Sequence, residues 1–155
     1  MKIPGELLER VVEHCLQEVP YEACGVLSGP VDGSPDQHHP MANGLVGGRA
    51  LLAFEFVPSD QLRLFTELDE AGRRPLVIYH SHTKGMAYPS IRDIANASLQ
   101  VHSLHLIVAT ERLDPGLPLG LQNGAIRLFK IGRGVVTQEP IELVVTQWLT
   151  IEVQQ

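Results

Sequence analysis

The amino-acid sequence predicts an α/β (α+β) fold, in which helices pack on a β-sheet. Three observations lead to this prediction. Apolar residues recur at helical spacing near the N-terminus, short apolar runs bounded by Gly and Pro are typical of strands, and the two patterns alternate along the chain. The chain has 155 residues and a hydrophobic content of 44%, which suits one domain with one core. We expect that domain to span residues 1–146, followed by a C-terminal tail at 147–155.

The first half of the chain is predicted to begin with a helix and to continue with strands. Apolar residues at helical spacing, with charged residues opposite them, indicate the helix, and Pro20 ends the pattern. The apolar positions are Leu7, Leu8, Val11, Val12, Cys15, Leu16 and Val19. A buried strand is expected at residues 23–29, followed by a turn rich in Gly, Pro and Asp. Further strands are expected within residues 38–44 and 49–57.

The second half is predicted to alternate helices with strands. Pro58 opens a helical pattern that stops at Gly72. The remaining expected elements are a buried strand at residues 75–80, a short helix at 90–99, a buried strand at 104–110, a loop at 114–118 and two strands within 124–131 and 133–145. The sequence contains no internal repeat.

Composition excludes several classes of protein. The net charge is −6 and no run of Lys or Arg occurs, so nucleic acid is not an expected partner. No apolar run approaches the roughly 18 residues of a membrane span, and the N-terminus lacks a signal-peptide core. Cys15 and Cys24 are too few for a disulfide framework and are expected to be buried, reduced thiols. We therefore predict a soluble, cytoplasmic protein that does not bind membranes.

The stretch YHSHTKGMAYPSIRD, residues 79–93, combines residues suited to binding a metal. Side chains alternate along a strand, so His80 and His82 point to the same side and converge on one position. Asp93 lies near the start of the following helix, from which its carboxylate can fold back to that position. Two neutral imidazoles and one carboxylate are typical of a catalytic zinc site that keeps its fourth position open.

Each part of this pattern also has a simpler interpretation. A lone His-x-His on a strand is more often a pair of ordinary polar positions, and Ser90-x-x-Asp93 is a good capping box for a helix. Taken together, however, the pattern is expected by chance in only about a few in ten thousand chains of this length. The β-lactamase type of metal motif fails because Lys84 and Gly85 stand where an acid and a histidine are needed, and no HExxH helix or deaminase PCxxC is present.

These residues resemble the JAMM (MPN+) zinc metalloprotease motif. The resemblance rests on His80, His82, Ser90 and Asp93 at the family's spacing, together with Glu22 in the upstream stretch PYEACGVLSG. It implies that Glu22 is the catalytic base, that Ser90 stabilises the oxyanion, and that the two histidines and Asp93 bind one Zn²⁺ per chain. It also implies a single JAMM/MPN domain with a mixed, curved sheet and packed helices, similar to the architecture of cytidine deaminases.

The wider sequence resembles one bacterial branch of this family, typified by the sulfur-carrier-protein cysteine hydrolases. The stretch HSHTKGMAYPS and residues 53–72 carry this likeness. It implies a peptidase that cleaves after the C-terminal Gly-Gly of a small ubiquitin-like sulfur-carrier protein and releases an amino acid, cysteine in the typical case. Thr83 and Tyr88 are the candidate contacts with the substrate. The segment around Gly44–Gly48 departs from the pattern.

Three alternatives remain open on the sequence. One is an isopeptidase acting on ubiquitin-like protein conjugates, and another is a non-catalytic scaffold of the same fold, although scaffolds usually lack some of the zinc ligands. The third, a purely structural zinc site, is disfavoured because three ligands leave one position open. The other histidines have no ligand-like spacing and are expected at the surface or half-buried: His14, His38, His39, His102 and His105. The oligomeric state is not predicted.

Overall fold

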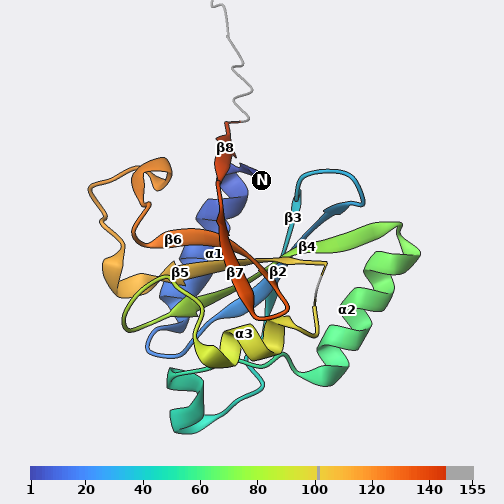
Figure 1. Ribbon diagram of the computed structural model, residues 1–155, viewed down its shortest axis with the longest axis horizontal. Helices are drawn as coiled ribbons and strands as arrows, with labels where there is room; N and C mark the ends of the chain where they lie inside the picture. Colours follow the sequence, from blue (N-terminus) through green and yellow to red (C-terminus); the bar gives the residue numbers. More distant parts are fainter. Residues whose placement is uncertain (101, 146–155) are drawn as a thin grey trace, which may run out of the picture.

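The computed structural model describes residues 1–100 and 102–145, and its main feature is a six-stranded mixed sheet with helices on both faces (Figure 1). The elements in chain order are β1 (Lys2–Pro4), α1 (Gly5–Glu18), β2 (Cys24–Pro30), β3 (Gln37–Met41), the 3₁₀ turn η1 (Gly47–Leu51), α2 (Pro58–Glu70), β4 (Arg73–His82), α3 (Ile91–Ala97), β5 (Leu104–Ala109), the 3₁₀ turns η2 (Thr110–Arg112) and η3 (Leu119–Leu121), β6 (Ile126–Gly132), β7 (Val135–Glu139) and β8 (Glu142–Val144). The predicted fold class is confirmed.

The six strands lie in the order β3-β2-β4-β5-β6-β7. Only the central pair β4 and β5 is parallel, and every other neighbouring pair is antiparallel. A parallel pair needs a crossover connection, and α3 lies on the crossover here. Since ligands of α/β sheets bind beyond the carboxyl ends of parallel strands, the end of β4 at His82 is a natural place for a site.

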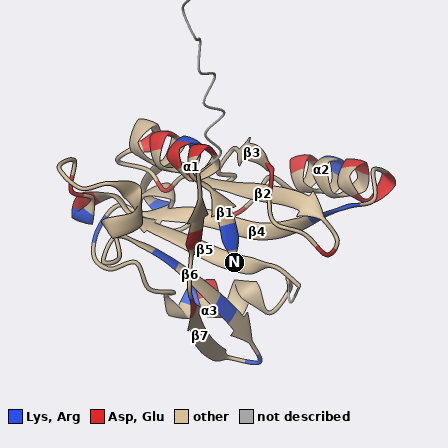
Figure 2. Ribbon diagram, turned by 90° about the horizontal axis from the view of Figure 1, so that it is seen from above, with Lys and Arg blue, Asp and Glu red and all other residues tan. Residues whose placement is uncertain are grey.

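The two faces of the sheet carry separate cores. On one face, α1 packs Leu8, Val11 and other apolar residues against the strands, together with Tyr79 of β4. On the opposite face, α3 buries Ala97 against β5 and β6, and α2 contributes partly buried residues that pack on Val26 and Ile78. Figure 2 shows α1 and α3 on opposite sides of the strands. The alternation of side chains along β4 therefore sends Tyr79 to the α1 face and His80 to the α3 face.

One predicted strand is wrong. Residues 49–57 form the turn η1 and an irregular segment in which Phe56 makes a single bridge with Asn43. The buried residues here are Ala50, Ala53 and Phe56, spaced by three, whereas Leu52 is 77% exposed. A half-buried strand requires a period of two, so the apolar composition of this segment indicated a strand that its burial pattern does not support.

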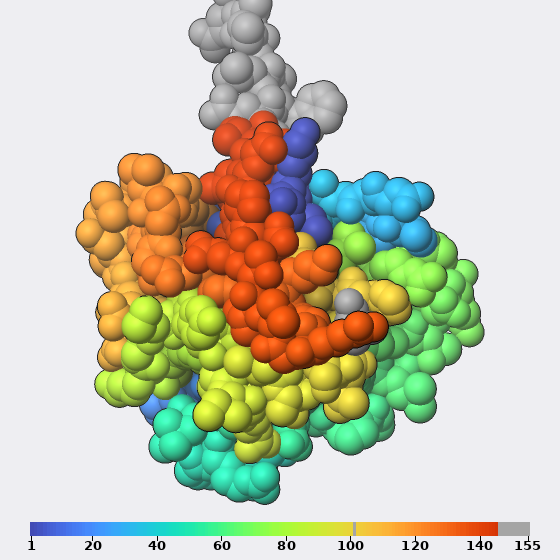
Figure 3. All heavy atoms as spheres, viewed as in Figure 1, coloured from blue at the N-terminus to red at the C-terminus, as the bar shows by residue number. Residues whose placement is uncertain are grey.

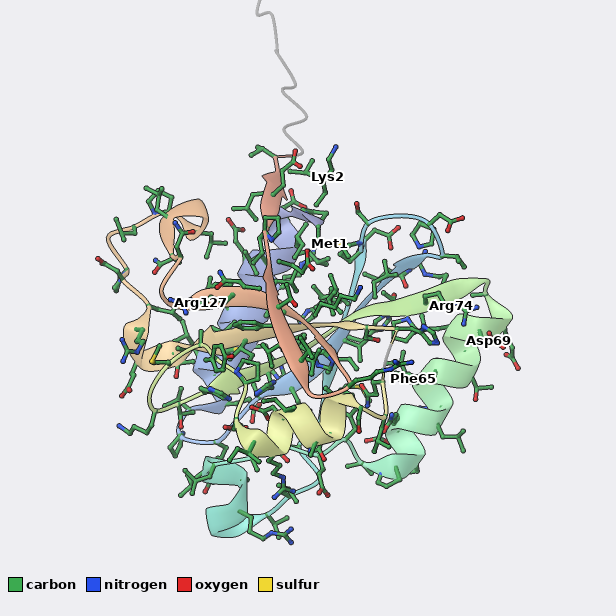
Figure 4. The ribbon with its side chains drawn as sticks, viewed as in Figure 1. Met1, Lys2, Phe65, Asp69, Arg74 and Arg127 are labelled. Atoms are coloured by element: carbon green, nitrogen blue, oxygen red, sulfur yellow. The ribbon has the colours of Figure 1, made fainter. Side chains whose placement is uncertain are left out.

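The C-terminal strands also differ from the prediction. The strand expected within residues 133–145 is divided at Pro140 into β7, which joins the main sheet, and β8, which does not. Instead, β8 pairs in parallel with β1, a strand that the sequence did not indicate. Met1 and Lys2 accordingly lie beside β8 (Figure 4). The tail predicted at residues 147–155 lies outside the described residues.

Two further expectations can be compared with the structure. Cys15 and Cys24 are both buried and free, as predicted. Among the helices in residues 1–100 and 102–145, none combines the length and apolar character that a membrane span requires.

Candidate metal centre

His80 and His82 lie at the carboxyl end of β4, and their Nε2 atoms are 3.0 Å apart. His80 is buried, and its ring stacks on Phe54 with centroids 4.6 Å apart. His82 Nδ1 lies 2.8 Å from the carbonyl oxygen of Met86, which can only accept a hydrogen bond. The Nδ1 of His82 therefore carries a proton, and Nε2, which faces His80 and Asp93, is the nitrogen that could bind a metal ion once it has lost its own proton.

Asp93 reaches the same position from the first turn of α3. It is part of a capping box: Ser90 Oγ accepts a hydrogen bond from the Asp93 N–H, and Asp93 Oδ2 accepts one from the Ser90 N–H at 2.8 Å. The same Oδ2 lies 3.3 Å from His80 Nε2 and 3.2 Å from His82 Nε2. Burial alone would raise the pKa of Asp93, but hydrogen bonds from the two imidazoles and from Ser90 hold it well below its usual range.

These three side chains fit a divalent metal ion. Three ligand atoms from His80, His82 and Asp93 lie within 4.8 Å of one another. Nitrogen and oxygen ligands about 2.0–2.1 Å from a tetrahedral zinc ion lie about 3.3 Å from each other, which is close to the 3.0–3.3 Å separations found here. The donor set of two imidazoles and one carboxylate is also one that zinc accepts. The predicted ligands are thus brought together by β4 and α3.

Glu22 lies beside this cluster, just before β2. It is only 5% exposed, and its neighbour Ala23 is tied to β4 because the Ala23 N–H donates to Ser81 Oγ at 2.8 Å. The Ser81 N–H donates in return to the Ala23 carbonyl at 3.0 Å. Ser81 is the residue between the two histidines, so this pairing holds the segment that carries Glu22 next to them.

The environment of Glu22 favours its neutral form. Burial raises the pKa of Glu22 to about 8; the charge of Asp93 also raises it, whereas His82 and Arg92 lower it. Its Oε2 atom has no hydrogen-bond partner among residues 1–100 and 102–145. A carboxyl group with a pKa near neutrality can both take up and release a proton at physiological pH, which is the property of a general base.

The loop of residues 43–56 covers this side of the site, and no sequence motif indicates its role. Asn43 anchors it: the side-chain amide donates to the carbonyls of Glu22 and Ala53 at 3.1 and 3.0 Å, and its oxygen accepts from the N–H groups of Leu45 and Glu55 at 3.0 and 3.3 Å. The Glu22 N–H in turn donates to the Ala50 carbonyl at 2.8 Å. Both backbone groups of Glu22 are therefore held by this loop.

A second contact joins the loop to α3. Arg92 Nη2 lies 2.7 Å from Glu55 Oε1, and Figure 3 shows the loop, in teal, against the yellow-green segment that includes α3. Phe54 of the same loop stacks on His80. Neither Glu55 nor Phe54 belongs to the metal-binding motif, and only their positions in three dimensions connect them with the site.

The other predicted site residues are less closely connected. Ser90 is exposed, and its hydroxyl oxygen accepts from the Asp93 N–H at 3.1 Å, which leaves its own proton free to be donated. Thr83 is half-buried and follows β4 directly. Tyr88 is 48% exposed, and its ring packs edge-on against Phe129. All three lie on or beside the connection between His82 and α3.

The expectation for the remaining histidines needs one correction. His105 is buried, with 7% exposed, because it lies on β5 inside the core beneath α3. His14 and His38 are half-buried, as expected, and both hydrogen bond to the hydroxyl of Tyr79, at 2.6 and 2.8 Å. This group lies on the α1 face, on the other side of the sheet from His80.

The chain is similar to known proteins both in sequence and in structure. A family model described as prokaryotic homologs of the JAB domain matches residues 4–118. The "CysO-cysteine peptidase" of Mycobacterium tuberculosis is 35% identical over 144 residues, covering 92% of this chain and 90% of that protein. A "Probable TtuB-protein conjugate cleaving protease" of Thermus thermophilus is 36% identical over 99 residues, covering 64% of each chain. The solution structure of a protein from Desulfitobacterium hafniense matches with a TM-score of 0.74 at 25% identity, covering 93% of this chain and 92% of that one.

Proposed function

The chain belongs to the family of prokaryotic JAB-domain homologs, and on that premise we propose that it is a zinc-dependent peptidase acting on a small ubiquitin-like sulfur-carrier protein. The bond cleaved is the amide that follows the carrier's C-terminal Gly-Gly, and the product released is an amino acid, cysteine, or a short extension. One observation carries the proposal: the Nε2 atoms of His80 and His82 converge with Asp93 Oδ2 at 3.0–3.3 Å, beside the buried carboxyl group of Glu22.

The protein groups divide the work of hydrolysis between them. His80, His82 and Asp93 would hold the zinc ion, which when bound supplies the Lewis acidity that polarises a carbonyl and acidifies water. Glu22 Oε2 takes a proton from the attacking water and later delivers it to the nitrogen of the leaving amine. Ser90 donates its free hydroxyl proton to the oxygen that becomes negative in the transition state. Thr83 and Tyr88 lie on the connection between β4 and α3 and are the proposed contacts with the carrier's tail.

The choice of substrate rests on likeness to relatives. The mycobacterial protein named as a CysO-cysteine peptidase matches over 92% of this chain, so the likeness extends well beyond the residues of the site. A second candidate is an isopeptidase that separates a ubiquitin-like protein from a protein conjugate, and the Thermus relative named as a conjugate-cleaving protease supports it over a shorter stretch. A non-catalytic scaffold is disfavoured because every residue of the motif is present.

The test is the intact mass of a Gly-Gly-terminated ubiquitin-like carrier extended by a C-terminal cysteine, before and after incubation with the zinc-loaded protein. We expect the loss of one cysteine residue, abolished by a chelator and by Glu22→Gln. A parallel reaction contains the same carrier joined through an isopeptide bond to a lysine of a second protein. Cleavage of the conjugate alone would favour the isopeptidase, and an unchanged mass in both reactions would refute the peptidase proposal.

A further inference from the structure

A cavity of about 230 Å³ lies behind His80, between the sheet, α3 and the start of α2. Its walls are mainly apolar and aromatic, but amide side chains from α2 and α3 and the acidic residues Glu55 and Asp93 also border it. His80, His105, Phe54 and Ile107 are among the residues that line it. A cavity needs only about 10–15 Å³ to hold one water molecule, so this one has room for several.

Two residues that line this cavity each carry a buried ring nitrogen without a hydrogen-bond partner among the described residues. These nitrogens are His80 Nδ1 and His105 Nε2, and the two residues are only 2% and 7% exposed. Within residues 1–100 and 102–145, only two other buried side-chain atoms are without a partner, on Glu22 and Arg73. Because leaving a buried polar atom without a hydrogen bond is unfavourable, two such atoms on residues that line one cavity point to a partner held in that cavity.

The two metal-binding histidines differ in this respect. A histidine that binds a metal through one ring nitrogen almost always donates its other N–H group to a carboxylate, a carbonyl or water, which fixes the orientation of the ring. For His82 that acceptor is the Met86 carbonyl, 2.8 Å away. For His80 none of the described residues provides a direct acceptor, and Phe54 stacks on the face of the ring without bonding to its edge.

The register of the central strands brings His105 close to His80. Ile78 pairs with His105 and His80 pairs with Ile107, so the two histidines are diagonal neighbours on the same face of the sheet. Side chains of diagonal neighbours on one face of a sheet lie within reach of each other, and since the two rings make no direct hydrogen bond, a bridge between them would need a water molecule. Burial lowers the pKa of His105 to about 4, so its ring is neutral at pH 7 and one of its nitrogens can accept a hydrogen bond.

We propose that His105 is a positioning residue for the metal centre, which orients the ring of His80 through water held in this cavity. The water accepts from the Nδ1–H of His80 and donates to Nε2 of His105, and the Nε2 lone pair of His80 then points toward Asp93 and the metal. The inference rests on the proposed metal-dependent function. It assigns a role to a side chain that touches neither the substrate nor the ion.

The test is the zinc affinity of chelator-treated protein, measured by competition with a chromophoric chelator, and it requires no substrate. His105→Phe keeps the size of the side chain and removes its hydrogen bonds, and we expect it to weaken zinc binding about 10–100-fold. His105→Gln keeps a polar group and should lose less. His102→Phe makes the same chemical change at an exposed position and serves as the matched control. The visible spectrum of the cobalt-substituted protein should also change in His105→Phe, since a rotated His80 alters the ligand geometry.

A second measurement needs no variant and applies if His105→Phe does not fold. Nitrogen-15 spectra of the zinc-loaded wild-type protein should show a His80 ring protonated at Nδ1 and a neutral His105 whose Nε2 carries no proton. Wild-type zinc affinity in His105→Phe, or a protonated Nε2 on His105, would overturn the inference alone. Failure of the wild-type protein to bind zinc would overturn the proposed function with it.

Discussion

Replacing Glu22 by glutamine should make the chelator-treated protein more stable while abolishing its activity. In the native protein this residue is only 5% exposed, its Oε2 has no partner in the part of the chain that the structure describes, and burial raises the pKa of Glu22 from 4.5 to about 8. Between these two values the native state keeps a proton that the unfolded state has released. The free energy of unfolding of the wild-type protein therefore decreases as pH rises through this window.

Glutamine has the same shape and no titrating proton, so the free energy of unfolding of Glu22→Gln should not decrease in this way. The shift corresponds to about 4–5 kcal/mol at pH 8 and above, as an upper limit, and the difference between the two proteins should vanish near pH 4.5. Urea denaturation at pH 5, 6, 7 and 8 in the presence of a chelator measures it. We expect the variant's advantage to grow with each step.

Two results would refute this reasoning. Equal stability of the two proteins at pH 8 would mean that the carboxyl group is solvated and its pKa ordinary, and a difference independent of pH would mean that glutamine stabilises by packing alone. The measurement of activity is an independent test, because a fully active Glu22→Gln enzyme would falsify the assignment of Glu22 as the base whatever the stability of the variant. Glu6→Gln on α1 is the matched control for loss of a carboxylate elsewhere in the chain.

The structure leads to four other predictions. Ser90→Ala should lower kcat by roughly 10²–10³ if the Ser90 hydroxyl stabilises the oxyanion. If the variant instead turns over normally and loses only about 1 kcal/mol of stability, the only role of Ser90 is to cap α3. Asn43→Ala should reduce kcat without removing zinc, because the backbone of Glu22 loses its anchor; metal content and steady-state kinetics measured together decide this, and unchanged kcat contradicts it. Gly25→Ala should cost about 1–3 kcal/mol in urea denaturation because its Cβ would overlap the Tyr79 ring, and Gly48→Ala, which meets nothing within 4 Å, should cost little. The wild-type protein should lose stability as pH falls from 6.5 to 4, because burial lowers the pKa of His38 to about 4 and only the unfolded state then binds a proton at this histidine. Over the same range the free energy of unfolding of His38→Gln should fall by less, the difference being at most about 3 kcal/mol. Identical acid denaturation profiles for the two proteins would exclude the effect.

The family and most of the secondary structure could be predicted from the sequence. Residues separated by a few positions within one strand or one helix turn have fixed relative directions, so local spacing was enough to place His80 and His82 on one face, and Ser90 with Asp93 at a helix start. The spacing of these residues led to a family resemblance that the match over residues 4–118 confirms. Periodicity was equally reliable for α1, α2 and the buried strands β4 and β5, because each buries one regular face.

The surroundings of these residues depend on the tertiary structure. Asn43, Phe54 and Ser81 support the site through contacts between segments distant in sequence, and no local pattern marks them. Part of the loop of residues 43–56 was predicted as a strand because it is rich in apolar residues. Composition alone does not reveal that the buried residues of this segment recur every three positions. The expectation that His105 lies at the surface or half-buried was wrong for a related reason. Whether a single polar side chain is buried depends on which strand lies beside its own, and the pairing of β4 with β5 is a property of the folded chain.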